Sequence, residues 1–347
     1  MTNVTIGMDL GDKKHEVCIL DQEGQIVERC SVGNTRIQLQ KMFKPYTGAL
    51  VAIETGTHSP WISRDLEDLG CRVLVGNSRK LKAIWASSQK TDSNDAEMLA
   101  RIARADPQLL CPIRHRNEKA QVDLEQIKAR DVLVSMRTKL INHVRGAVKS
   151  LGERLPACSA NSFHKRAIEH LPNRLRSALT PLIEQVASTT EKIRCYDRQI
   201  EALAESDYPE TALLRQVQGV GLITSLSFVL TLESPDRFDR SRAVGPFLGF
   251  TPRRDQSGRI DKQLRISKQG DGDLRRLLVS CAQYIMGHFG QDSDLRRYGM
   301  RLLARGGRAA KKKAVVAVAR KLAVLLHRLW STGERYQPLY NAPNLKH

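Results

Sequence analysis

Residues 4–9 read VTIGMD, an alternating apolar stretch that ends on an acid, Asp9. EVCIL at 16–20, the turn DQEG at 21–24 and QIVERC at 25–30 follow, and they have the pattern of two strands joined by a tight turn. The stretch therefore predicts a first strand that leads into a β-hairpin, which is the beginning of a sheet.

The segments after the hairpin alternate between helix and strand. Their apolar patterns predict a helix over 35–43, a strand over 49–54, a helix over 59–69, a strand over 71–76 and a helix from residue 92. Pro60 stands in a first helical turn, where proline is favoured. This order predicts an α/β domain with a mixed sheet over residues 1–115.

Long helices are expected next, in residues 116–207. Apolar residues recur at helical spacing over 118–150, and near a repeat of three and four over 177–205. Two such helices can pair as an antiparallel coiled-coil hairpin, or they can join two copies of the chain. The sequence leaves both arrangements open.

Residues 208–347 are expected to form a third, mainly helical unit. Residues 213–232 contain Gly219 and Gly221 as a hinge between two helical runs. A tail helix is predicted over 309–330, because its apolar residues recur at spacings of three and four. The run RAAKKK at the start of that helix is cationic.

Charge is the strongest global signal in the chain. The formal net charge is +19, from 56 Lys and Arg residues against 37 Asp and Glu residues. Residues 1–110 hold 14 of each kind, so the whole excess lies in the rest of the chain. A neutral front joined to a strongly basic remainder indicates a polyanionic partner, usually nucleic acid. A basic ribosome-associated or membrane-associated protein is the alternative.

Other classes of protein are disfavoured by what the sequence lacks. It has no run of about eighteen apolar residues, and its first residues have no signal-peptide pattern. We therefore expect a cytoplasmic, nucleoid-associated protein without membrane spans. The seven cysteines are scattered and form no Cys-x-x-Cys pair, so neither a disulfide framework nor a zinc site is expected.

Acidic residues stand at informative positions in the first domain. Asp9 and Glu54 end predicted strands. Asp92 and Asp95 are three residues apart at a helix start, so they share a face. Carboxylates that converge in this way suit Mg²⁺, or Mn²⁺, because a hard ion takes a few protein oxygens and keeps positions for water and phosphate. Two such ions about 3.5–4 Å apart can stabilise both the attacking and the leaving oxygen of a phosphodiester.

Each acid also has a plainer interpretation. Asp92 could cap its helix, Asp95 could complement the helix dipole, and Glu54 could be a surface residue. Asp9 has glycine two residues away on each side, a pattern that also opens actin-like ATPase and sugar-kinase domains. An ATPase needs later glycine-rich phosphate loops, and no convincing one is present. The four acids in this order together favour a metal site.

Three blocks of the sequence resemble a known family. The blocks are IGMDLGDKKHEVCIL (6–20), VAIETGTHSPW (51–61) and QKTDSNDAEMLARIA (89–103). They look like the catalytic blocks of DEDD-type insertion-sequence transposases, which are bridge-RNA-guided serine recombinases with an RNase H/RuvC-like N-terminal domain. The resemblance extends over most of the chain. It implies a metal-binding catalytic quartet that consists of Asp9, Glu54, Asp92 and Asp95.

The C-terminal third continues the resemblance. LRQVQGVGLITSLSFV is similar to a helix-hairpin-helix-like segment of the family, in which Gly219 and Gly221 would let backbone amides meet a phosphate. Gln218 stands where the family commonly has proline. GFTPRRDQSGRI (249–260) is similar to the block that carries the family's serine nucleophile, and the match falls on Ser257.

The serine block also contains cations that suit this chemistry. A serine hydroxyl needs a base, a metal or a positive field to become a good nucleophile, and Arg253 and Arg254 could hold the scissile phosphate. Without the family, the block is simply a turn with a solvated basic pair. Ser267 is a rival serine, although its loop is more typical of phosphate binding before a helix. Further nucleic-acid contacts are expected from Arg265, Lys268, Arg275 and Arg276.

The resemblance predicts a recombinase that cleaves and rejoins DNA at the ends of an insertion sequence and at a target. It also implies a structured guide RNA, which would be recognised by charge and shape because aromatic residues make up only 5% of the chain. Strand exchange requires several active sites, so a dimer or tetramer joined through the helical middle is expected. Ser257 is far from the quartet in sequence, so the two must meet by folding or across protomers.

Two other functions remain open on the sequence. A RuvC-like junction endonuclease would use the quartet with water as nucleophile and would not need Ser257. A non-catalytic nucleic-acid-binding protein on a degenerate nuclease fold would need neither group.

Overall fold

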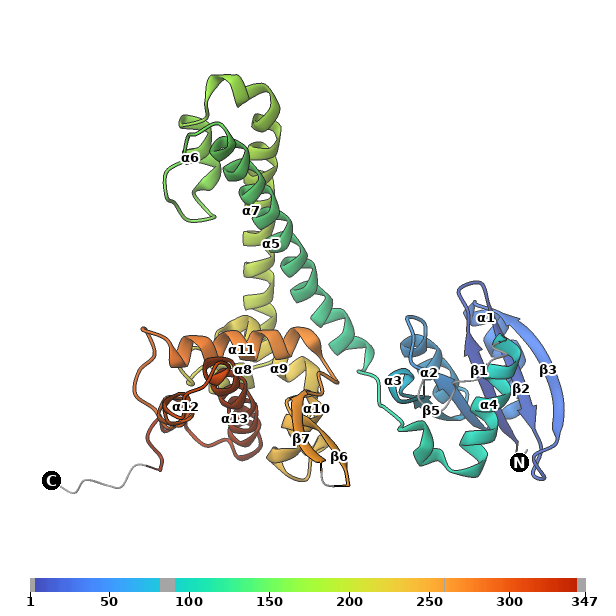
Figure 1. Ribbon diagram of the computed structural model, residues 1–347. Helices are drawn as coiled ribbons and strands as arrows, with labels where there is room; N and C mark the ends of the chain where they lie inside the picture. Colours follow the sequence, from blue (N-terminus) through green and yellow to red (C-terminus); the bar gives the residue numbers. More distant parts are fainter. Residues whose placement is uncertain (1–3, 82–90, 259, 342–347) are drawn as a thin grey trace. The chain divides into compact units, whose positions relative to one another are not determined.

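The computed structural model describes residues 4–81, 91–258 and 260–341, and the chain divides into two compact units after Arg116 (Figure 1). The elements of unit 1 are β1 (Thr5–Leu10), β2 (Lys14–Leu20), β3 (Ile26–Gly33), α1 (Arg36–Phe43), β4 (Leu50–Glu54), α2 (Ser59–Asp68), β5 (Arg72–Gly76), α3 (Ser78–Leu81) and α4 (Asp92–Ala105). Those of unit 2 are α5 (Glu118–Ser150), α6 (Phe163–Glu169), α7 (Arg176–Asp207), α8 (Glu210–Leu214), α9 (Leu222–Leu232), α10 (Val244–Phe247), β6 (Pro252–Ser257), β7 (Ile260–Ile266), α11 (Gly272–Met286), α12 (Asp294–Ala304) and α13 (Ala310–Thr332).

Unit 1 is built on a mixed sheet of five strands in the order β3-β2-β1-β4-β5. β1 pairs with β2, and β2 with β3, in antiparallel fashion. β4 and β5 run parallel to β1, because each is reached through a helical connection that returns the chain to the same edge. The α/β prediction with a mixed sheet is confirmed.

Helices cover both faces of this sheet. Apolar residues of β1 and β4, such as Met8 and Ile53, pack with Phe43 of α1 and Leu66 of α2 on one face. On the other face α4 packs against β1, β2 and β4. Successive residues of a strand therefore pack alternately against the helices on one face of the sheet and against α4 on the other.

Gly7 of β1 sets how closely α4 approaches the sheet. A Cβ atom at this position would lie 2.0 Å from the backbone oxygen of Ala96 and 2.5 Å from the backbone nitrogen of Ala100. Backbone atoms cannot move aside as a flexible side chain can. The backbone of α4 therefore rests directly on β1, and only glycine allows this contact.

Gly7→Ala is expected to destabilise unit 1 by about 1–3 kcal/mol or more, because α4 must move away from the sheet. Chemical denaturation followed by circular dichroism measures this loss. Gly56→Ala is the matched control, since a Cβ there would meet no atom within 4 Å. Equal stability of the two variants would contradict the close packing of α4 on β1.

In unit 2, the long helices α5 and α7 lie side by side within one chain (Figure 1). Val144 and Val148, near the end of α5, pack with Ile183 and Val186, near the start of α7. A second apolar cluster joins the start of α5 and the end of α7 to residues of α9. The sequence left open whether these two helices pair with each other or join two copies of the chain. In the structure their apolar residues pack against each other within one chain.

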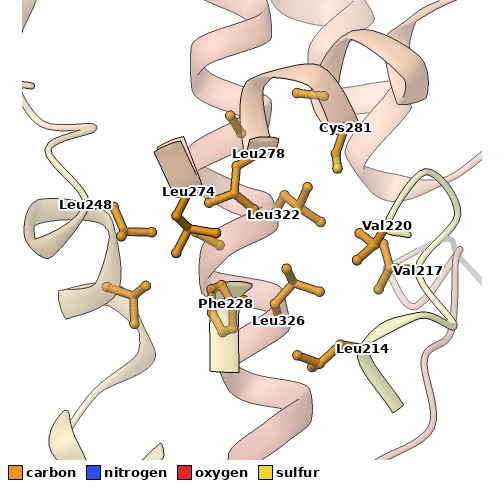
Figure 2. Close-up of a cluster of buried hydrophobic side chains, with 14 of the residues drawn as sticks. Leu214, Val217, Val220, Phe228, Leu248, Leu274, Leu278, Cys281, Leu322 and Leu326 are labelled. Atoms are coloured by element: carbon orange, nitrogen blue, oxygen red, sulfur yellow. The ribbon is translucent and has the colours of Figure 1, made fainter. Parts of the chain in front are cut away.

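The largest core of unit 2 lies among α8, α9, α11 and α13 (Figure 2). Phe228 of α9 is fully buried between Leu274 of α11 and Leu326 of α13. None of the described helices is long and apolar enough to cross a membrane. Each of the seven cysteines is a free thiol.

Candidate active site

Asp9 and Glu54 lie at the carboxyl ends of neighbouring strands. β1 and β4 are parallel, and their register continues to the residues just before these two acids. Side chains alternate along a strand, so Asp9 shares a face with Gly7. By the same rule Glu54 shares a face with Ala52. Both of these smaller residues lie against α4, so the two half-buried acids belong to the α4 face at one edge of the sheet.

The direction of α4 brings its first turn to the same edge. Near the opposite end of the helix, Arg101 and Arg104 donate to the carbonyl oxygens of Gly24 and Gln22, at 3.3 and 2.5 Å. These carbonyls are in the turn between β2 and β3, which lies at the edge where β1 begins. The first turn of α4 therefore points to the edge where β1 ends, which is where Asp9 lies.

Asp92 and Asp95 are the first and fourth residues of α4. Thr91 caps the helix, because its hydroxyl accepts the amide hydrogen bond of Asn94 at 3.3 Å. The interpretation of Asp92 as the helix cap is therefore wrong. Asp92 is exposed and Asp95 is half-buried. Two residues of the same sequence block, Gln89 and Lys90, lie outside the described residues.

A fifth acid, Glu16, lies on the same face and was not among the expected site residues. It is directly opposite Asp9 in the pairing of β1 with β2. Its carboxylate accepts hydrogen bonds from Lys14 at 2.7 Å and Ser31 at 2.9 Å, which hold the pKa of Glu16 below its usual value. The hydrogen bond from Lys14 to Glu16 and the negative charge of Glu16 raise the pKa of Lys14, and the charge of Asp92 adds a smaller contribution in the same direction. Strand alternation on the two sides of the short turn at residues 11–13 is the sequence signal that could have found Glu16, but only once the register of β1 with β2 is known.

The acids share an edge without forming a closed ligand set. Within residues 4–81, 91–258 and 260–341, no three acidic, histidine or cysteine side chains lie close enough to hold a metal ion together. Their donor chemistry nevertheless fits Mg²⁺, which takes carboxylate oxygens and completes its shell with water. The fold thus provides hard oxygen donors along a common edge rather than a preformed cage.

Ser257 is the last residue of β6, beside the tip of a hairpin in unit 2. β6 and β7 pair antiparallel, with Ser257 opposite Ile260. The interpretation of this block as only a turn is therefore wrong. Arg253, Arg254 and Ser257 are all exposed. Arg254 makes a two-pronged ion pair with Asp261, at 2.6 and 2.5 Å, so a phosphate would have to compete with this carboxylate for it.

The two glycines between α8 and α9 have different surroundings. Gly219 has a φ of +90°, and a Cβ there would lie 2.8 Å from the ring of Tyr284 in α11. Glycine at this position is therefore required for the turn and its packing. Gly221 is extended and a Cβ there would meet no atom within 4 Å. Of the two, Gly221 has the space in which a phosphate could approach.

Two of the predicted nucleic-acid contacts have structural partners within unit 2. Arg275 donates to the carbonyl oxygens of Leu248 and Gln269, both at 2.9 Å, which ties the loop before α11 to the core. Arg276 pairs with Asp131 of α5 at 2.8 Å. Both guanidinium groups are therefore already engaged by groups of the chain itself.

The other two predicted nucleic-acid contacts, Arg265 and Lys268, lie in or beside the loop before α11. Arg265 and Lys268 are exposed, and Lys268 has a left-handed φ of 56°. The first turn of α11 is capped by Asp271, whose carboxylate accepts two amide hydrogen bonds at 3.0 and 2.9 Å. The phosphate site expected after Ser267 is therefore already filled by a carboxylate of the chain itself.

Comparison with protein families links the predicted acids of unit 1 with Ser257 of unit 2. A DEDD-type transposase family model matches residues 6–152, which include the four predicted acids. A second model, described as the transposase IS116/IS110/IS902 family, matches residues 211–299, which include Ser257. The chain belongs to this family of transposases. Such enzymes cleave and rejoin DNA, and the family predicted from the sequence is confirmed.

Curated relatives of this transposase match it over most of its length. The transposase for insertion sequence element IS1111A of Coxiella burnetii is 27% identical over 96% of the chain and 91% of the relative. A probable family 20 transposase of Pseudomonas aeruginosa is 27% identical over 96% of the chain and 98% of the relative. The transposase for element IS1328 of Yersinia enterocolitica is 28% identical, over 82% and 85%. The similarity therefore extends through both units.

Proposed function

We propose that this transposase cleaves DNA at the ends of an insertion sequence and at its target, and rejoins the strands through a serine-linked intermediate. The observation that carries the proposal is the acidic edge of unit 1, where Asp9 and Glu54 end parallel neighbouring strands under the first turn of α4. The sheet order, with an antiparallel hairpin beside a parallel pair, supports the RuvC-like fold expected for such a domain.

The acidic edge would hold Mg²⁺ or Mn²⁺. Asp9 and Glu54 would be the ligands from the strands, and half-buried Asp95 is better enclosed than exposed Asp92 to complete the set. When bound, the ion supplies positive charge that polarises the phosphodiester. Glu16 is already neutralised by Lys14 at 2.7 Å, so we assign it a supporting role rather than that of a ligand.

Ser257 is the proposed nucleophile. Its hydroxyl oxygen forms a bond to the phosphorus while the bond from phosphorus to one DNA oxygen breaks. The serine gives up its proton, and the departing DNA oxygen takes one to become a hydroxyl. Rejoining reverses these exchanges with another DNA hydroxyl, so the phosphoserine ester conserves the bond. Exposed Arg253 would hold the phosphate. Arg254 would also contact the phosphate once its ion pair with Asp261 breaks.

A structured RNA is the proposed guide. The excess positive charge of the chain lies after residue 110, which suits a folded polyanion. Aromatic side chains that could stack on bases are few, at 5% of the chain. Sequence would then be specified by pairing between RNA and DNA, while the protein holds the backbone.

Assembly into a dimer or tetramer is proposed through the pair formed by α5 and α7. Val132 and Met136 are one turn apart on α5, and these residues are 58% and 45% exposed. Apolar residues exposed in this way suit a contact with a second copy. Because Ser257 and the acids belong to different units, one copy could supply the serine and another the acids.

Trapping a protein–DNA adduct tests the proposal. The purified chain is incubated with guide RNA, element-end DNA and Mg²⁺, then denatured, and the linked peptide is identified by mass spectrometry. We expect the DNA to be attached to Ser257. An adduct on Ser267, or cleaved DNA without any adduct, would contradict the assignment, and the second result would favour hydrolysis by water.

A further inference from the structure

A cluster of exposed cations lies where α12 and α13 meet. We call it the 301–313 cluster, and its members are Arg301, Arg305, Arg308, Lys311, Lys312 and Lys313, all exposed. α12 and α13 pack against each other and are joined by residues 305–309 (Figure 1). The end of one helix and the start of the other therefore bring these charges together. The cluster lies beyond residue 299, where the second family match ends.

No carboxylate balances the 301–313 cluster. Residues 295–333 contain no Asp or Glu, and none of the ion pairs in the described part of the chain includes a member of the cluster. Other exposed arginines of unit 2 do have acidic partners. Arg297, for example, pairs with Asp292 at 2.6 Å. The six charges therefore repel one another, and among the described residues none of them forms an ion pair with a carboxylate.

The lysines of the 301–313 cluster also stand at the unfavourable end of a helix. A helix N-terminus carries partial positive charge, so a nearby cation is electrostatically unfavourable there. α13 begins with Lys311, Lys312 and Lys313 in its first turn, without an acidic residue or a side-chain cap. Local stability does not explain this placement. Features that break local rules without compensation are expected at functional sites.

We propose that the 301–313 cluster binds the phosphate backbone of duplex DNA. Cations that neutralise phosphates release condensed counterions, which gives affinity without reading sequence. DNA is the polyanion on which this family of enzymes acts, so the proposal does not depend on the acidic edge or on Ser257. The cluster positions DNA and takes no part in the chemistry.

The surroundings of the cluster favour a duplex over a single strand. Single-stranded sites typically use aromatic side chains on which bases stack, and residues 299–313 contain no aromatic residue. Tyr298 of α12 already has the ammonium group of Lys321 4.1 Å from its ring centroid. Gly306 and Gly307 in the turn have open space around them, so a duplex backbone can come close to the chain there.

Binding to duplex DNA as a function of salt tests this site. The full chain and a triple variant are compared on a duplex several helical turns long, with EDTA present so that no cleavage occurs. The triple variant carries Lys311→Gln, Lys312→Gln and Lys313→Gln. We expect it to bind on the order of a hundredfold more weakly at about 0.1 M salt, and the slope of log affinity against log salt to fall by about 2–3.

A charge-matched variant is the control. It neutralises three cations that already have acidic partners in unit 2, by Lys128→Gln, Arg174→Gln and Arg194→Gln. This control is expected to bind DNA within a few-fold of the unchanged chain. Equal losses in the two variants, or no loss in the triple variant, would overturn the site.

Two further measurements make the result unambiguous. The melting temperature of the triple variant should stay the same or rise, because cations are removed from a helix N-terminus. A duplex RNA of the same length is the second ligand. If the triple variant loses RNA binding while its DNA binding is unchanged, the cluster is an RNA site and the proposal fails.

Discussion

Ser257→Ala is expected to abolish strand joining and the covalent protein–DNA adduct, with recombination lowered on the order of 10³-fold or more. The change removes the hydroxyl that forms the bond to phosphorus. Ser257 is exposed at the end of β6, so alanine leaves the core intact and DNA binding should persist. Recombination of labelled element ends with a target, resolved on a denaturing gel, measures the effect.

Ser267→Ala is the control for this experiment, since Ser267 immediately follows β7 in the same basic region. It should recombine DNA at close to the normal rate. Full recombination by Ser257→Ala would remove this residue as the nucleophile. Cleavage without joining in the same variant would instead favour a junction endonuclease that activates water.

Asp9→Asn is expected to lower cleavage by about 10²–10³-fold or more, because a metal ion contributes several kcal/mol of charge stabilisation in the transition state. The two side chains have the same shape, so the packing of β1 should be preserved while a negatively charged oxygen ligand is lost. Cleavage rates measured against Mg²⁺ and Mn²⁺ concentration should show both a lower maximum and a higher metal requirement.

Asp106→Asn is the matched control at the other end of α4. Asp106 follows the last residue of the helix, and its carboxylate accepts the amide hydrogen bond of Gln108 at 2.9 Å, which asparagine can also accept. The cleavage rate of the Asp106→Asn variant should stay within about twofold of that of the unchanged chain. Unchanged transposition by Asp9→Asn would favour a chain that binds nucleic acid without catalysing its cleavage.

The elements of unit 1 were predictable because their signals are local. A two-residue period marks the half-buried strands, and short apolar runs bounded by turn residues mark the buried ones. The strand that ends on Glu54 and the helix that starts at Asp92 both lie where the pattern places them. Glu16 was missed because its role depends on which residue of β1 it faces, and that requires the register of the hairpin.

Other features of the site depend on contacts that no local pattern contains. The period of α5 fits a partner in the same chain or in another, and only packing against α7 shows which was used here. Arg275 and Arg276 are basic residues in a basic segment, yet their guanidinium groups are held by carbonyl oxygens and by Asp131. Asp271 fills a helix start that the loop sequence suggested for phosphate.

The sequence by itself determined the family, the α/β class of the first domain, the order of the four acids and the excess of positive charge. These depend on residue identity and short-range periodicity, which a linear chain records. Only the tertiary structure decided that Asp9 and Glu54 share one face and one edge, since that needs parallel pairing of strands 45 residues apart. Only the tertiary structure showed which cations are neutralised by nearby carboxylates, because ion pairing depends on distances between segments that fold together.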